Sequence, residues 1–193
     1  MLAKSSLLQA IALKNRGLLA TAADTQAILS SIAQLEDRNP TARPTEAADL
    51  LEGDWRLLYT TSRGILGIDG LPLFNLGQVY QCIRVKEAKI YNIAEIYGLP
   101  YLEGIVSVTA EFEPVSDRRV MVTFKRSLSG LQRLIDYQSP SNLIAQIEAG
   151  KNFTAIDFSI NRDQRGWLDI TYLDEDLRIG RGNEGSVFVL TKG

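Results

Sequence analysis

Residues 106–113 carry the feature that most constrains the fold, because apolar and polar side chains alternate there without a break. A period of two puts one kind of side chain on each face of an extended strand, which predicts a β-strand with one buried face and one wet face. Residues 119–125 repeat the alternation after the turn-like Ser116-Asp117-Arg118. The two segments together predict a β-hairpin.

Further strand-like runs precede and follow this hairpin at short intervals. The intervals leave no room for crossover helices, so the sheet is predicted to be antiparallel and meandering. Closing it into a barrel would remove its exposed edges, and a sandwich of two sheets is the alternative. About nine strands are expected, at residues 55–61, 78–85, 89–97, 106–113, 119–125, 154–160, 167–173, 177–180 and 186–191.

The first 45 residues follow a helical period instead of a strand period. We therefore expect a mainly β chain with two N-terminal helices at residues 1–45, packed on or near a barrel at residues 46–193, as one structural unit. The two apolar stripes of the helical part contain Leu7 and Ile11, and Ile28, Ile32 and Leu35.

Two segments interrupt the strands. In residues 139–150, Ser141 is a candidate cap for a short helix. Residues 63–76 form a long apolar loop, and such loops are uncommon unless they cover or meet something. This loop is either a lid or membrane-dipping portal, or two short turns that seal the barrel end. The portal or lid side chains would be Ile65, Leu66, Leu71, Leu73 and Phe74.

Composition excludes several classes of function. The chain has no histidine, which removes the commonest general base and zinc ligand. A net charge of −2 gives no field that would attract nucleic acid. The single cysteine, Cys82, is expected to be a core or wall residue. Gly180-x-Gly182-x-x-Gly185 has dinucleotide-binding spacing but precedes a strand, so no dinucleotide cofactor is predicted. No other cofactor and no metal are predicted either.

The two ends of the strand region carry a family resemblance. Residues 51–62 read Leu-Glu-Gly-Asp-Trp-Arg-Leu-Leu-Tyr-Thr-Thr-Ser, and residues 176–190 read Asp-Leu-Arg-Ile-Gly-Arg-Gly-Asn-Glu-Gly-Ser-Val-Phe-Val-Leu. The first resembles the entry motif of the plastid lipid-associated (fibrillin) family, and the second is similar to that family's closing segment. The order of parts also matches, so the resemblance covers nearly the whole chain.

The resemblance implies a lipocalin-like barrel and a non-enzymatic role. Fibrillins attach to photosynthetic membranes or lipid globules (plastoglobules) and handle carotenoids, quinones or other prenyl and acyl lipids under light stress. The expected partners are a hydrophobic small molecule or lipid and, peripherally, a membrane or lipid-globule surface. The expected location is the cytoplasm and thylakoid surface of a cyanobacterium, or a plastid once a transit peptide is removed. The family offers no established catalytic residues.

Trp55 and Arg178 are the most informative candidates inside such a barrel. In lipocalin-type barrels a tryptophan on the first strand closes one end and a late arginine stacks over it, with or without a ligand. Arg181 lies three residues beyond Arg178, so at most one of the two faces the lumen. Strand parity, which one bulge would invert, gives the ligand-binding candidates Trp55, Tyr59, Phe124, Tyr172, Arg178 and Phe188.

The N-terminal segment carries Lys4, Lys14 and Arg16 before its first acidic residue, Asp24. It is interpreted as a helix packed against the barrel, in preference to an amphipathic helix on an anionic lipid surface or a transit peptide.

Two rival functions remain from the sequence. In the first, the barrel is solid and the protein is an adaptor that coats lipid surfaces or recruits a lipid-biosynthetic enzyme. In the second, the protein is an enzyme that uses strand carboxylates such as Asp157 and Asp169, which would need to approach each other with raised pKa values. The more ordinary role of both carboxylates is to face outward or to bind arginines.

Overall fold

The computed structural model describes residues 2–67, 74–160, 165–183 and 185–193. Its helices are α1 (Leu2–Ile11), α2 (Ala22–Glu36), the 3-10 turn η1 (Pro44–Glu46), α3 (Ala48–Leu51), α4 (Arg63–Leu66), α5 (Gln132–Ile135) and α6 (Pro140–Glu148). Its strands are β1 (Gly53–Thr60), β2 (Asn75–Arg84), β3 (Lys89–Tyr97), β4 (Gly104–Pro114), β5 (Arg119–Leu131), β6 (Ile156–Ser159), β7 (Arg165–Leu173), β8 (Leu177–Gly182) and β9 (Val187–Lys192).

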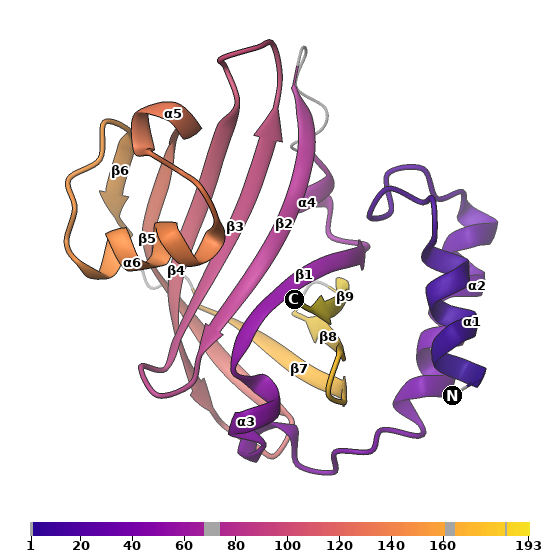
Figure 1. The fold of residues 1–193 in the computed structure, drawn as a ribbon. Coiled ribbons are helices and arrows are strands. Elements are labelled where there is room, and N and C mark those ends of the chain that lie inside the picture. Colours follow the sequence, from indigo (N-terminus) through magenta and orange to yellow (C-terminus); the bar gives the residue numbers. More distant parts are fainter. Residues whose placement is uncertain (1, 68–73, 161–164, 184) are drawn as a thin grey trace.

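Within the described residues, eight strands close into an antiparallel barrel. Neighbouring strands follow the order β4, β3, β2, β1, β9, β8, β7, β5, and a β4–β5 ladder joins the two ends of this row (Figure 1). The ninth strand, β6, pairs with β5 outside the ring. The predicted antiparallel barrel of about nine strands after N-terminal helices is confirmed, and the closed ring excludes the sandwich.

Strand β5 is long enough to serve two neighbours on one edge. Residues 119–123 pair with β7, whereas residues 126–129 pair with β6. The barrel wall is therefore taller on the side of β2 to β6 than on the side of β7, β8, β9 and β1 (Figure 1).

The ladder between β1 and β2 is short and leaves a seam in the wall. It ends at Arg56, which is paired with Tyr80. The α1–α2 connection lies across this seam: the Thr60 N–H donates to the Arg16 carbonyl at 3.0 Å, and the Arg16 guanidinium donates to the Leu76 carbonyl at 2.5 Å. A loop residue thus joins two strands that do not join each other there.

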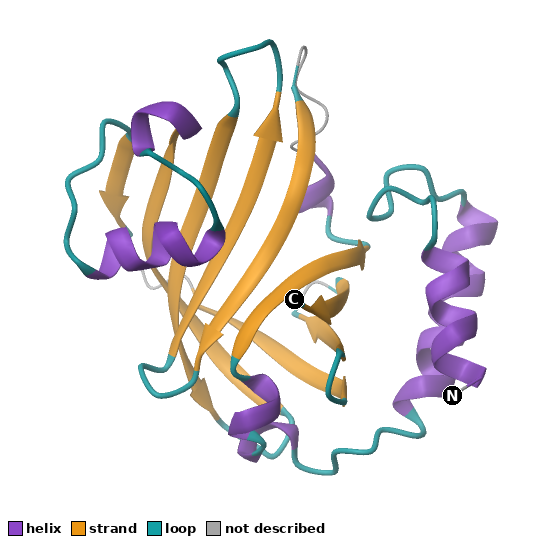
Figure 2. Cartoon of the chain, viewed as in Figure 1, coloured by secondary structure: helices purple, strands orange, loops and turns teal. Residues whose placement is uncertain are grey.

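Helices α1 and α2 form a layer on the outer face of β1, β7, β8 and β9 (Figure 2). A capping box between Thr21 and Asp24 fixes the start of α2. The predicted apolar stripes of both helices are buried in this layer, which we call the helix-facing cluster. It contains Leu7, Ile11, Ile28, Ile32, Leu35, Tyr59, Tyr172, Leu177, Ile179, Val187 and Val189.

The basic side chains of the N-terminal segment are bound within the protein. Lys4 pairs with Asp174 at 2.8 Å, Lys14 pairs with Asp24 at 3.0 Å, and Arg16 crosses the seam. These contacts favour the interpretation of α1 as a helix packed against the barrel. In the described part of the chain, no helix combines the length and the apolar character needed to span a membrane.

Helices α5 and α6 cover a second outer face, over β2 to β5. The helix predicted in residues 139–150 is present, but the predicted cap was wrong: Ser139 caps it, because its Oγ accepts from the Asn142 N–H. Ser141 instead donates to Asp54 of β1 at 2.8 Å. The buried residues of this layer are Cys82, Tyr91, Ile93, Ile105, Leu128, Ile135, Leu143 and Ile144.

Candidate functional site in the barrel interior

The side chains that face the barrel interior form one apolar cluster drawn from strands all around the ring. We call them the inner wall. None of its members comes from the helices of the two outer layers, which identifies the cluster as the interior. Its strand members are Trp55, Leu57, Leu76, Val79, Ile83, Ile90, Ala94, Ile170, Leu173 and Leu190, with Phe112, Val122 and Phe188 packed against them.

Over residues 105–108 of β4 the inward face is less buried than the outward face, which is covered there by α5 and α6. Val106 is opposite Ala94 of the inner wall, and Val108 shares its side of the strand. Both keep part of their surface accessible, whereas the outward-facing Ile105 and Ser107 are each 1% exposed. A barrel filled by its own side chains would bury its inward face most completely. Solvent therefore reaches this part of the interior.

Strand β6 adds two large apolar side chains to the inner side. Phe158 is paired with Ser127 and Ile156 with Ser129, and Ser129 is opposite the inward-facing Val106. The two side chains are 54% and 69% exposed. Apolar surface of this kind beside an accessible interior is available to cover an apolar ligand.

Trp55 closes one end of the barrel. Its side chain is fully buried, and its indole N–H donates to the Leu51 carbonyl of α3 at 2.9 Å. The Arg178 guanidinium lies 5.0 Å from the ring centroid and Lys192 Nζ lies 5.3 Å from it. Lys192 also donates to the Leu50 carbonyl of α3. The expected contact between Trp55 and Arg178 is present, and such a contact contributes about 0.5–2 kcal/mol.

The two late arginines face opposite sides of β8. Arg178 is paired with Leu190 of the inner wall and points inward. Arg181 points outward and donates to the Glu36 carboxylate of α2 at 2.7 and 2.8 Å. Arg178 is therefore the arginine that enters the interior.

The Arg178 guanidinium is buried without an acidic partner. It donates to Gln81 Oε1, and the Gln81 amide donates to Asn92 Oδ1 at 2.9 Å. In the described residues, no carboxylate lies within ion-pair distance of it. Burial lowers the pKa of Arg178 to about 9, so the group is still charged at neutral pH. We call Arg178, Gln81 and Asn92 the polar floor.

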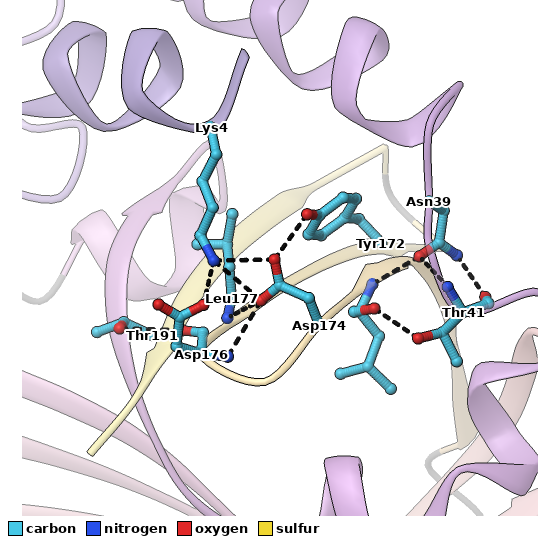
Figure 3. Close-up of polar contacts among 9 residues, drawn as sticks. Lys4, Asn39, Thr41, Tyr172, Asp174, Asp176, Leu177 and Thr191 are labelled. Carbon is cyan, nitrogen blue, oxygen red and sulfur yellow. Dashed lines mark hydrogen bonds and ion pairs between the residues drawn. The ribbon is translucent and has the colours of Figure 1, made fainter. Parts of the chain in front are cut away.

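Strand parity predicted Tyr59 and Tyr172 in the lumen, and the structure corrects both. A β-bulge between Leu57 and Tyr59, and another between Ile170 and Tyr172, reverse the side of the strand on which each tyrosine lies. Both belong to the helix-facing cluster. The Tyr172 hydroxyl donates to Asp174 at 2.7 Å, beneath α1 (Figure 3).

The other predicted contact residues face the interior. Phe188 packs against the inner wall. Phe124 is opposite the buried Ala110 and lies two residues beyond Val122, which also packs against the wall. Both phenylalanines keep accessible surface.

The predicted lid is described in part. Its beginning forms the single turn α4, whose Ile65 packs against the inner wall, while Leu66 and Phe74 are partly buried. The predicted lid residues Leu71 and Leu73 lie outside the described residues.

The carboxylates considered for catalysis have separate arginine partners. Asp157 accepts from Arg126 at 2.7 and 2.5 Å, and Asp169 accepts from Arg119 at 2.6 and 2.8 Å. The Arg126 guanidinium holds the pKa of Asp157 below its ordinary value. Asp157 therefore lacks the raised pKa of an acid catalyst. No group of three histidine, cysteine or acidic side chains suited to a metal occurs in the described part of the chain.

Three features of the interior were not predicted. Gln81 and Asn92 occupy inward positions in the runs at 78–85 and 89–97. The sequence did contain a signal for both residues. Each is a polar residue between two apolar residues, two positions away on either side, that face the same side of the strand. The inward exposure of the apolar pair on β6 had no such signal, because the course of that strand depends on how β5 divides its edge.

A family model described as PAP_fibrillin matches residues 1–191. A chromoplast-specific carotenoid-associated protein of Cucumis sativus is 35% identical over 88% of the chain and 61% of its own length. A light-induced chloroplastic protein of Solanum tuberosum is 34% identical over 92% of the chain and 63% of its own length. A chloroplastic plastid-lipid-associated protein of Citrus unshiu is 33% identical over 92% of the chain and 64% of its own length. The chain spans about three fifths of the length of these curated relatives.

Proposed function

The chain belongs to the PAP_fibrillin family, and from this premise we propose that it is a non-enzymatic protein that binds or stores a hydrophobic small molecule in its barrel. The relatives are named as lipid-associated and carotenoid-associated proteins. By that likeness the ligand is a prenylquinone, a carotenoid or an acyl lipid, and the setting is photoprotection. The protein then works in a plastid or, in a cyanobacterium, in the cytoplasm and at the thylakoid surface.

The observation that carries this proposal is the accessible apolar interior. Val106 and Val108 expose surface on the inward face, and Ile156 and Phe158 of β6 extend the same side with little cover. Each methylene removed from water there stabilises a complex by about 0.8 kcal/mol before ordering costs. A ten-carbon chain would gain about 8 kcal/mol, which is enough for useful affinity without any catalytic group.

The test is to purify the protein from a pigmented photosynthetic host, extract it with organic solvent and identify bound lipid by mass spectrometry. Val108→Phe adds an aromatic ring on the inward face of β4. Glu113→Phe adds the same ring on the outward, exposed face of the same strand. Stoichiometric lipid in the wild type and in Glu113→Phe, with loss in Val108→Phe, is expected. An empty wild-type barrel would overturn the proposal and favour the solid adaptor.

A second part of the proposal is peripheral contact with a lipid surface. The β3–β4 connection, at the end of the barrel away from the β4–β5 turn (Figure 1), exposes Leu99 by 51% and Tyr101 by 73%. Apolar side chains on a loop suit shallow insertion at a lipid interface. Leu99→Ser with Tyr101→Ser should reduce co-flotation with vesicles of plastid galactolipids, whereas Val115→Ser in the β4–β5 turn should not. Equal flotation of the wild type and both variants would exclude this loop as the site of lipid contact.

A further inference from the structure

The polar floor is incomplete as a structural element. Arg178 is 2% exposed, yet among the described residues its hydrogen bond is to the neutral side-chain oxygen of Gln81. The outer arginine of the same strand, Arg181, has a bidentate carboxylate partner although it is less buried. A guanidinium has five N–H donors in a fixed fork, and a buried charge without a counter-ion is costly. The more buried arginine thus has the weaker set of partners.

The position of Arg178 decides what kind of chemical group could pair with its guanidinium. The guanidinium lies over Trp55, at the closed end of the barrel, and its hydrogen-bond partner Gln81 is paired with Trp55 on the inward face of β2. Gln81 and Asn92, which link it to the wall, both keep accessible surface. The apolar surface of Val108 and Phe158 lies on the same inward side. An amphiphile with its head at the floor would have its apolar tail against the inner wall.

We infer that the polar floor binds the anionic head group of a long-chain carboxylate, with Arg178 as its counter-ion and Gln81 as the residue that positions the guanidinium. This inference rests on the proposed function, since it requires that the interior accept an apolar chain. A carboxylate matches the planar fork of a guanidinium bidentately, which an ester or a hydrocarbon end does not. The floor therefore selects the acid over its ester.

The first experiment compares two probes on the intact chain. cis-Parinaric acid and its methyl ester share one fluorescent tail and differ in the head group, which is an anionic carboxylate in the first and a neutral methyl ester in the second. The wild type is expected to bind the acid more tightly by about tenfold or more. If neither probe binds, the proposed function fails. If both bind equally, the proposed function stands and the carboxylate site is overturned.

Two variants locate the preference. Arg178→Met keeps an unbranched apolar side chain and should abolish the preference for the acid while leaving ester binding. Arg181→Met removes the outward arginine of the same strand and should keep the preference. If Arg178→Met retains the preference, the floor is not the site.

Gln81→Glu is the decisive variant, because it gives Arg178 an internal carboxylate at the atom that already accepts its hydrogen bond. The fold should be retained, acid binding should fall about tenfold, and ester binding should be unchanged. This outcome does not depend on how well Arg178→Met folds. Unchanged acid binding in Gln81→Glu would show that Arg178 is only a structural partner of Trp55.

Discussion

Asp174→Ala should destabilise the protein far more than removal of the ion pair that Asp174 makes. The carboxylate accepts from Lys4 at 2.8 Å, from the Tyr172 hydroxyl at 2.7 Å, and from the backbone N–H groups of Asp176 and Leu177 at 3.0 and 2.8 Å (Figure 3). The last three bonds shape the β7–β8 turn, and a hydrogen bond to a charged group contributes about 1.5–3 kcal/mol. After a discount for partial exposure we expect a loss of about 3 kcal/mol, against less than about 1 kcal/mol for Lys4→Met.

Urea unfolding followed by tryptophan fluorescence measures this difference. Asp176→Ala is the matched control, because it removes the other carboxylate that binds Lys4 but keeps the bonds that shape the turn. It should cost less than about 1 kcal/mol. Equal losses in Asp174→Ala and Lys4→Met would refute the reasoning, since the ion pair would then be the main contribution.

The same carboxylate gives a pH dependence. Burial alone would raise the pKa of Asp174, but the bonds from Lys4, Tyr172 and Asp176 outweigh it, and the pKa lies below its ordinary value of 3.8. A carboxyl group with a depressed folded-state pKa stabilises the fold fully above its unfolded pKa and loses that contribution as pH falls toward the folded value. The stability gap between wild type and Asp174→Ala should therefore narrow below about pH 4. A gap that widens in acid would contradict this assignment.

Three further outcomes are expected. Cys82 should resist thiol reagents until the protein is unfolded, because burial raises the pKa of its thiol; rapid labelling of the native protein would contradict this. Gly17→Ala should destabilise the fold in urea titrations, because Gly17 has φ +114 and an added Cβ would lie 2.5 Å from the Thr60 carbonyl oxygen; unchanged stability would show that the seam can rearrange. Leu143→Ala in α6 should cost about 2–5 kcal/mol, and a cost under about 1 kcal/mol would mean that α6 is not part of the cooperative unit.

The sequence was sufficient for the strand pattern and insufficient for side-chain direction at two places. Alternation in residues 106–113 located β4, because a period of two is local information. Tyr59 and Tyr172 were placed on the wrong side, because each follows a bulge that only the pairing partner reveals. Phe124 and Phe188 face the interior, as parity predicted.

The polar floor was predicted only in part for a similar reason. The contact between Trp55 and Arg178 was expected from the two end motifs, and it is present. Its continuation through Gln81 and Asn92 depends on the register of β2 with β1 and β3, which sets these side chains side by side. Register of this kind is a tertiary property that composition and period do not contain.

The hydrogen bonds of Arg16 give the N-terminal segment a second structural role besides covering the outer face of the barrel. Thr60 and Leu76 belong to strands that part at this height, and the loop between α1 and α2 is the piece that spans them. The loop between the first two helices therefore connects β1 and β2 beyond the end of their ladder. A protein that lacks residues 1–16 would lose both hydrogen bonds that span this seam, and within the described residues β1 and β2 would be joined by the ladder from Gly53 to Arg56 alone.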